Sequence, residues 1–110
     1  MESSTQSNYN LITSTENTFK AFFDAFVSEK LDQPKTHIFL QLSENLNTTI
    51  QDLSLFLKIA ASYRSNGMSF VVICNGIDID DVPDEINVVP TLTEAEDVLE
   101  MEEIERDLDF

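Results

Sequence analysis

Most side chains in this sequence that could do chemistry are carboxylates, and they gather toward the C-terminus. The chain has 21 Asp and Glu residues against six Lys and Arg, which gives a formal net charge of -15 at pH 7. Asp78, Asp80, Asp81, Asp84 and Glu85 are close enough together to suggest a calcium-binding loop. An EF-hand loop needs a Gly at its sixth position and a Glu at its twelfth, and both are missing here. We therefore interpret this segment as a solvated loop and expect no metal site.

The single histidine and the single cysteine give no catalytic arrangement in the sequence. His37 has no second histidine with which it could hold a metal ion. Cys74 has no neighbouring Cys, His or basic residue that would lower its pKa, so we expect a buried structural thiol. Gly67 and Gly76 are the only glycines, which excludes the glycine-rich loops that cradle nucleotide phosphates. The sequence therefore predicts a protein that is not an enzyme and that uses no cofactor.

The densest group of carboxylates lies on the last predicted helix. Nine acids and one base occupy positions 94–109, and acids at i, i+4 spacing repel each other and destabilise a helix. A chain that tolerates this cost can use the surface to bind a basic partner, and the candidate contact residues are Glu96, Glu100, Glu103 and Asp107. Such a complex should weaken as salt is raised. The alternative, which we leave open, is a helix face that is only solvated.

The overall charge restricts the classes of partner. A chain this acidic is repelled by nucleic-acid phosphates and by anionic lipid, so we expect a protein partner with a basic surface and no direct nucleic-acid or membrane contact. No apolar run approaches the ~20 residues of a membrane span, and the N-terminus lacks the pattern of a secretory signal. One cysteine forms no disulfide within the chain, which favours a reducing compartment. We therefore expect a cytoplasmic protein, with its oligomeric state open.

Alternating strand and helix patterns predict the elements that position these side chains. Four strand patterns lie at 9–12, 36–42, 68–74 and 87–90. The second and third are almost continuously apolar, which is typical of strands covered on both faces, as in a parallel sheet. Apolar residues at helical spacing predict helices at 13–31, 48–67 and 91–108. We expect one α/β domain over residues 9–110, with about four mostly parallel strands, helices packed on the sheet, and a flexible segment over residues 1–8.

Each predicted helix opens on a threonine that could cap it, and two of these threonines precede a Glu by three residues. The capping residues are Thr13 with Glu16, Thr48 or Thr49, and Thr91 with Glu94. The apolar positions of the last helix are Leu92, Ala95, Val98, Leu99, Met101, Ile104 and Leu108. These patterns set the ends of the helices and the side of each that should meet the core.

Three segments of the chain stand out by their motifs and their order. In the first, the strand at 38–42 (IFLQL) precedes a short polar loop and a helix. In the second, the strand at 69–73 (SFVVI) follows the Asn-Gly pair at 66–67. The third and most specific is 87–95 (NVVPTLTEA), which precedes an acidic helix. Together they resemble a STAS domain, the fold of anti-sigma-factor antagonists. The likeness covers about residues 36–107, and the whole chain resembles a group of short bacterial STAS-like proteins that often carry the label ribonuclease Z.

The resemblance implies a site and a mode of regulation. Regulatory STAS domains are phosphorylated by a partner kinase on a Ser or Thr at the start of the helix that follows this strand. Thr48 is the nearest match here, with Thr49 beside it, but Asn47 stands where the family has Asp and no Gly follows. The alternative is that both threonines only cap the helix. The likeness also implies that Ser43, Asn47 and Asp52 are candidate contacts for a partner.

The leading hypothesis is a non-catalytic regulatory or adaptor domain that acts by protein–protein interaction, as anti-sigma-factor antagonists do. A second is an accessory partner of an RNA-processing enzyme, because the resembling group shares the ribonuclease Z label and the charge suits a basic partner. The chain cannot be that nuclease, since two metal ions need a cluster of His and Asp ligands and His37 is the only histidine. A third hypothesis is a small-molecule or lipid-binding STAS-like module, for which the sequence shows no lining motif.

Overall fold

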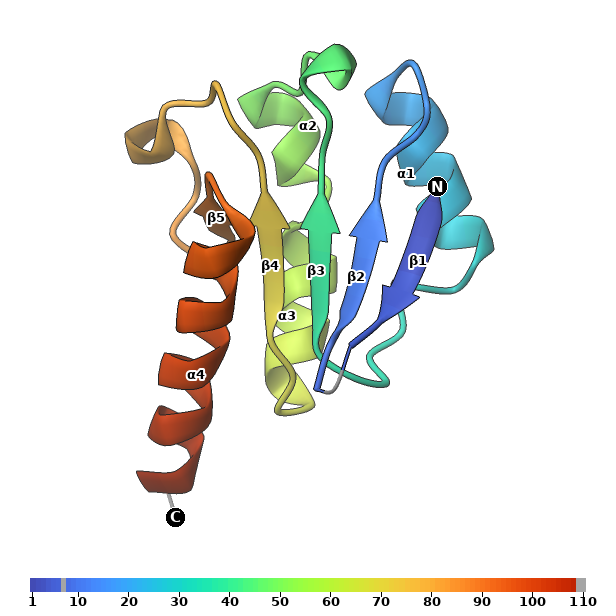
Figure 1. The fold of residues 1–110 in the computed structure, drawn as a ribbon. Helices are drawn as coiled ribbons and strands as arrows, with labels where there is room; N and C mark the ends of the chain where they lie inside the picture. Colours follow the sequence, from blue (N-terminus) through green and yellow to red (C-terminus); the bar gives the residue numbers. More distant parts are fainter. Residues whose placement is uncertain (7, 109–110) are drawn as a thin grey trace.

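A five-stranded sheet with its strands in the order β1-β2-β3-β4-β5 lies at the centre of the molecule (Figure 1). This computed structural model describes residues 1–6 and 8–108. The strands are β1 (Glu2–Thr5), β2 (Asn10–Thr13), β3 (Ile38–Gln41), β4 (Phe70–Ile73) and β5 (Asn87–Val89). The first strand runs antiparallel to β2, whereas β2 to β5 are paired in parallel. The α/β class predicted from the sequence is confirmed, and the sheet is mixed, with one strand more than expected.

The N-terminal strand β1 is the element that the sequence patterns do not predict. Its residues Glu2–Thr5 are all exposed, so they carry no apolar alternation. Backbone pairing with β2 places the strand, with Ser3 opposite Ile12. The N-terminal amine also forms an ion pair with Glu16 at 2.7 Å. These contacts correct the expectation of a flexible segment over residues 1–8, because part of that segment forms an edge of the sheet.

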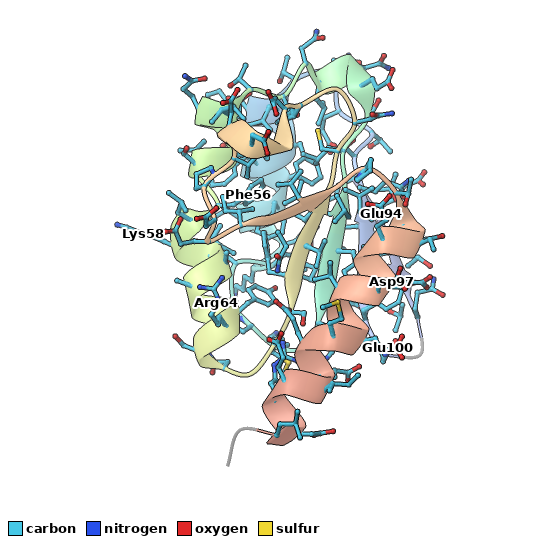
Figure 2. All side chains as sticks on the ribbon, turned by 90° about the vertical axis from the view of Figure 1, so that its left-hand side faces the viewer. Phe56, Lys58, Arg64, Glu94, Asp97 and Glu100 are labelled. Carbon is cyan, nitrogen blue, oxygen red and sulfur yellow. The ribbon has the colours of Figure 1, made fainter. Side chains whose placement is uncertain are left out.

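Helices cover both faces of this sheet. They are α1 (Phe19–Ser28), α2 (Ile50–Ser54), α3 (Leu57–Ser65) and α4 (Leu92–Leu108), with short 3-10 turns η1 (Glu44–Leu46) and η2 (Ile79–Asp81). Right-handed crossovers between neighbouring parallel strands place α1, α2 and α3 on one face as the chain advances from β2 to β4. After β5 the chain passes to the other face, where α4 lies (Figure 1, Figure 2). Among the described residues, no helix has both the length and the apolar character needed to cross a membrane.

The larger core lies between the sheet and helices α1 to α3, and it is rich in phenylalanine. Phe56 is fully buried at its centre, in the link between α2 and α3. Four other rings lie 5.4 to 5.7 Å from it between centroids: Phe19, Phe23, Phe26 and Phe70. Because three of these rings come from α1, the aromatic stripe of that helix belongs to the core and not to a ligand site.

The first helix begins later in the chain than its capping pattern predicts. Thr18 is the N-cap of α1, and its hydroxyl accepts a hydrogen bond from the Ala21 N–H at 3.1 Å. The predicted pair of Thr13 and Glu16 is wrong, because Thr13 belongs to β2 and Glu16 binds the N-terminal amine. Thr13 and Thr18 both precede the apolar stripe of α1, so sequence spacing alone could not decide which of them caps the helix.

The predicted middle helix consists of two helices, α2 and α3. Thr49 caps α2 through a capping box: its Oγ1 accepts from the Asp52 N–H at 3.1 Å, and Asp52 Oδ2 accepts from the Thr49 N–H at 3.0 Å. After α2, the N–H groups of Leu55 and Phe56 bond to carbonyls three residues back, at Asp52 and Leu53. This tighter turn buries Phe56 and leaves Leu55 54% exposed. The capping role expected at this helix start is therefore confirmed for Thr49.

Candidate partner-binding surface

The last helix, α4, is held on the sheet by a small apolar core. Thr91 Oγ1 accepts a hydrogen bond from the Glu94 N–H at 3.3 Å, which is the capping contact expected from the sequence. Ala95 and Leu99 are buried against the second face of the sheet. The buried sheet-side residues of this core are Tyr9, Phe39, Val71 and Ile73. One side of α4 is therefore fixed to the sheet, and the opposite side faces outward.

The outward side of α4 carries three large apolar side chains. Met101, Ile104 and Leu108 are 61%, 52% and 75% exposed. Because successive residues of an α-helix are about 100° apart, these three lie on one stripe that points away from the buried Ala95 and Leu99. We call Met101, Ile104 and Leu108 the apolar row. The apolar residues of this helix therefore fall into two groups, one buried against the sheet and one exposed. The sequence analysis treated them as a single set.

The four acids predicted as partner contacts on α4 share a neighbouring stripe. Glu96, Glu100, Glu103 and Asp107 follow one another at intervals of three or four residues, so they project from one side of the helix. Three of them are exposed and Glu103 is half-buried. The outer surface of α4 therefore presents carboxylates directly beside its apolar row.

Three of these acids also line a hollow between α4 and the segment that precedes β2. The hollow has a volume of about 250 Å³, and its lining residues are Asn8, Tyr9, Glu96, Leu99, Glu100 and Glu103. The Tyr9 ring stacks on Phe39 with 4.2 Å between centroids, and its hydroxyl donates to Glu96 Oε2 at 2.8 Å. Burial and the neighbouring Glu96 carboxylate raise the pKa of Tyr9, so the phenol remains a proton donor. Asp107 lies about one turn beyond the lining.

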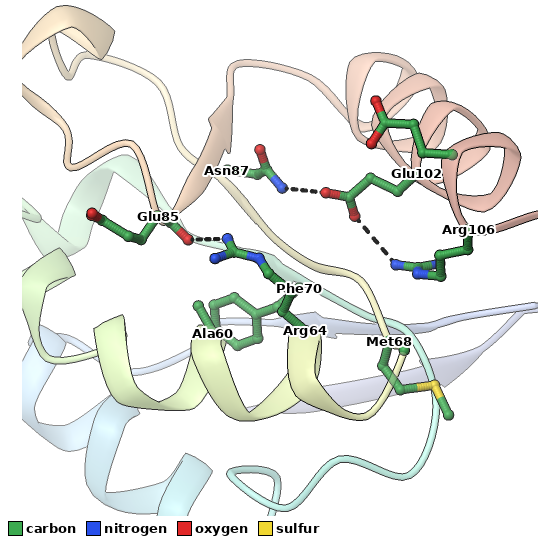
Figure 3. A pocket seen from close by; sticks show the side chains of 10 residues that line it. Ala60, Arg64, Met68, Phe70, Glu85, Asn87, Glu102 and Arg106 are labelled. Atoms are coloured by element: carbon green, nitrogen blue, oxygen red, sulfur yellow. Dashed lines mark hydrogen bonds and ion pairs between the residues drawn. The ribbon is translucent and has the colours of Figure 1, made fainter. Parts of the chain in front are cut away.

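A polar cluster attaches the C-terminal half of α4 to β4 and β5 (Figure 3). Ser69 is 1% exposed, donates its hydroxyl proton to Glu102 Oε1 at 2.6 Å, and accepts from Arg106 Nη2 at 2.6 Å. The Asn87 amide donates to Glu102 Oε2 at 3.0 Å. Arg106 and Glu102 also form an i,i+4 ion pair at 3.5 Å. Both oxygens of the Glu102 carboxylate are thus hydrogen-bonded, as a carboxylate at a half-buried position requires.

His37 belongs to the same cluster and favours its neutral form. Its Nδ1 accepts the Ser69 N–H at 2.8 Å, so the proton of the neutral ring lies on Nε2, which is 3.8 Å from Glu103 Oε2. Burial and the neighbouring Arg106 lower the pKa of His37, and Glu103 and Glu102 oppose this shift only in part. A second proton would also have to displace the Ser69 N–H from Nδ1.

The cluster has the residue types of a nucleophilic site, but its contacts are those of a structural link. A serine nucleophile must reach a substrate and pass its proton to an oriented base. The hydroxyl of Ser69 is enclosed between a carboxylate and a guanidinium, and His37 Nδ1 is occupied by the backbone of the same serine. Sequence reasoning missed this cluster because its members lie far apart in the chain and share no local pattern. They are His37, Ser69, Asn87, Glu102 and Arg106.

Beside this cluster lies a second hollow, of about 310 Å³, between α3 and α4 (Figure 3). Its lining residues are Ala60, Arg64, Gly67, Met68, Phe70, Glu85, Asn87, Glu102, Glu105 and Arg106. Arg64 Nη2 donates to the Glu85 carbonyl oxygen at 2.8 Å, and Arg106 is held by Ser69 and Glu102. Because both guanidinium groups are engaged and three glutamates share the lining, the hollow shows no preference for an anionic ligand.

The second surface predicted from the sequence, residues 43–52, lies at the carboxyl end of β3. Ser43 Oγ accepts from the Asn45 N–H at 3.2 Å, and Asn47 ends η1 in the left-handed conformation with a φ of 48°. Thr48 Oγ1 is buried and has no hydrogen-bond partner among the described residues. Figure 1 shows this segment at one end of the sheet and on the other face from α4, so the structure does not bring the two predicted surfaces together.

The remaining candidates for chemistry form no site in residues 1–6 and 8–108. Cys74 is buried as expected, and burial, with a contribution from Glu44, raises the pKa of its thiol. A protonated thiol is a poor nucleophile. No group of three or more His, Cys, Asp or Glu side chains in the described part of the chain is placed to hold a metal ion.

No protein-family model matches this chain, and no curated protein matches it. Three features of the molecule itself bear on function. They are the apolar row of α4, the carboxylates beside it, and the strongly negative charge of the whole chain.

Proposed function

We propose that this protein is a non-catalytic regulatory or adaptor domain that binds a protein with a basic surface through the outer side of α4. The observation that carries the proposal is the composition of that side. An exposed apolar row lies among carboxylates, on a helix that has eight acids and one base. Protein-binding sites combine apolar contact area with charges complementary to those of the partner. The outer side of α4 offers both to a partner rich in Lys and Arg.

The one base of α4 does not neutralise these outer carboxylates. Arg106 points inward, where it donates to Ser69 and pairs with Glu102. Glu94, Asp97 and Glu100 are exposed along the helix (Figure 2). The negative potential of the outer side is therefore uncompensated, and it would attract a basic protein over a distance of about one Debye length, ~8 Å at physiological salt.

The likeness of residues 36–107 to STAS domains supports a regulatory role of the anti-sigma-factor-antagonist kind. In that interpretation Thr48 or Thr49 would receive a phosphate. The Thr48 hydroxyl oxygen is buried, and the Thr49 hydroxyl accepts the Asp52 N–H as the N-cap of α2. A kinase would therefore have to uncover the Thr48 hydroxyl, or replace the capping hydrogen bond of the exposed Thr49. For this reason we assign the main partner contact to α4 and not to residues 43–52.

An accessory role beside an RNA-processing enzyme is compatible with the same surface. Proteins that handle nucleic acid carry Lys and Arg on their own surfaces, since these residues neutralise phosphates. The outer carboxylates of α4 fit such a protein as well as they fit another basic regulator. The identity of the bound protein distinguishes the two roles. A small-molecule role has weaker support, because the arginines of the larger hollow are already engaged.

Affinity capture from a lysate of the source cells, with two matched charge variants, tests this function. The first variant neutralises the outer side of α4 with Asp97→Asn, Glu100→Gln and Asp107→Asn. The control removes the same charge elsewhere with Glu2→Gln, Glu29→Gln and Asp84→Asn, all exposed positions away from α4. We expect the wild type and the control to retain the same basic protein, and its retention to fall between about 0.05 M and about 0.5 M salt. Equal retention by the α4 variant would contradict the proposal.

A further inference from the structure

Large exposed apolar side chains are concentrated on one helix of this protein. In the described part of the chain five such side chains are exposed, and three of them are the apolar row of α4. The other two, Val27 and Leu55, lie singly on α1 and in the link after α2. Single exposed apolar residues are ordinary, whereas an aligned group of them marks a binding surface.

The spacing of the apolar row matches one face of a helix. Met101, Ile104 and Leu108 stand at i, i+3 and i+7, so they form a straight stripe about 10 Å long along α4. Ala95 and Leu99, which are buried against the sheet, lie on the other side of the same helix. A helix with an apolar stripe on each side has two packing surfaces, and the sheet occupies only one of them.

Carboxylates border the apolar row on both sides. By helical spacing, Glu100 and Asp107 lie along one side of the row, Glu105 lies along the other, and Asp97 lies one turn before Met101. All four are exposed. The surface therefore has an apolar centre and an anionic rim, which is complementary to a segment with an apolar centre and a cationic rim.

The charge of the chain selects among the possible occupants of this stripe. A second copy of the chain would bring a like-charged rim against this one, with a net charge of -15 on each molecule. Anionic lipid and nucleic acid would be repelled in the same way. A basic amphipathic helix avoids this repulsion, because its apolar side chains can cover the row while Lys or Arg meets the rim.

We propose that Met101, Ile104 and Leu108 are the apolar centre of a contact surface for one basic amphipathic helix of the partner. This inference rests on the proposed function and adds the secondary structure and apolar spacing of the segment that is bound. The partner helix carries apolar residues at i, i+3 or i+4, and i+7, and its flanking Lys or Arg residues pair with Asp97, Glu100, Glu105 and Asp107.

A pair of synthetic peptides separates recognition of the row from attraction to charge. The first peptide contains only lysine and leucine over about five helical turns, with leucines at helical spacing; the second has the same composition in scrambled order. Binding to the full chain is measured by fluorescence anisotropy. We expect the amphipathic peptide to bind at least about tenfold more tightly than the scrambled one, because only it can bury the row.

Variants of the chain assign the effect to the row. Met101→Gln, Ile104→Gln and Leu108→Gln together should abolish the difference between the two peptides. Val27→Gln with Leu55→Gln, which removes the exposed apolar side chains outside α4, should preserve it. Circular dichroism verifies that each variant keeps its helices.

The possible failures are distinguishable. If both peptides bind equally and the triple variant binds as the wild type does, the apolar row is not a contact, whereas attraction of a basic partner survives. If neither peptide binds at low salt, both this inference and the proposed function are wrong.

Discussion

The hydroxyl of Ser69 lies 2.6 Å from the carboxylate of Glu102, although 33 residues separate the two in the chain. This hydrogen bond joins the residue before β4 to the C-terminal half of α4. Arg106 and Asn87 complete the link. Only Ala95 and Leu99 of α4 are fully buried, so the apolar contact with the sheet is small. The polar link therefore helps to hold α4 on the sheet, with its outer side exposed.

Glu102→Ala should destabilise the fold by about 1–3 kcal/mol, because it leaves the Ser69 hydroxyl and the Asn87 amide without their acceptor. Urea unfolding measures the free-energy change. Glu105→Ala is the control, since that exposed side chain should change stability by less than about 0.5 kcal/mol. Equal effects of the two substitutions would show that the cluster does not hold α4.

His37 should make the stability of the protein depend on pH. Its pKa in the folded chain lies below the ordinary value of 6.5, so the unfolded chain takes up this proton first as pH falls. The contribution of His37 is therefore fully present above about pH 6.5 and is lost as the pH falls toward the lower folded pKa. A His37→Gln variant, which cannot take the proton, should lose less stability than the wild type between pH 7 and pH 5, roughly the range in which histidine titrates. Parallel unfolding curves over that range would rule out this role.

The two threonines at the start of α2 should respond in opposite ways. Thr49→Ala removes the N-cap and the capping box, at a cost of about 1 kcal/mol. Thr48→Val replaces a buried hydroxyl that has no partner in the described residues with a methyl group of similar shape, so stability should stay the same or increase. Thermal unfolding of both variants checks the contrast. A larger loss from Thr48→Val would mean that this hydroxyl has a ligand or a water as its partner.

Phe56 should be among the most sensitive core positions. Phe56→Ala removes a fully buried ring that packs against four others, and we expect a loss of about 3–5 kcal/mol. The adjacent Leu55 is 54% exposed, so Leu55→Ala should cost less than about 0.5 kcal/mol. Chemical denaturation compares the two. Similar losses would contradict the break between α2 and α3 that separates these neighbours.

The fold could be predicted from the sequence wherever apolar periodicity was strong. β3 and β4 show continuous apolar runs, and α1 and α4 show apolar residues at helical spacing. These elements bury one or both faces, and burial leaves such patterns in the local sequence. The strand β1 gave no such signal, because its exposed residues are held by backbone pairing. The break between α2 and α3 at Phe56 was also not predicted. The apolar residues keep the spacing of one helix across this tight turn, so the sequence pattern shows no break there.

The candidate surface could be predicted only in part. Charge counting identified α4 and the stripe of Glu96, Glu100, Glu103 and Asp107. It did not show that Met101 and the rest of the apolar row face outward, because helical spacing separates two apolar stripes but does not tell which of them the sheet covers. The polar cluster around Ser69 could not be predicted for a different reason. Its residues lie far apart in the chain and come together only in the folded structure.

Mapping the contact on the chain itself tests most directly whether the outer side of α4 is the binding surface. The captured basic protein, or the amphipathic peptide, is titrated into the isotope-labelled chain while backbone amide shifts are recorded. We expect the largest changes along residues 97–108 of α4, with α1 to α3 unaffected and the changes reversed by salt. Changes confined to residues 43–52, or to the helices on the other face of the sheet, would contradict the assignment.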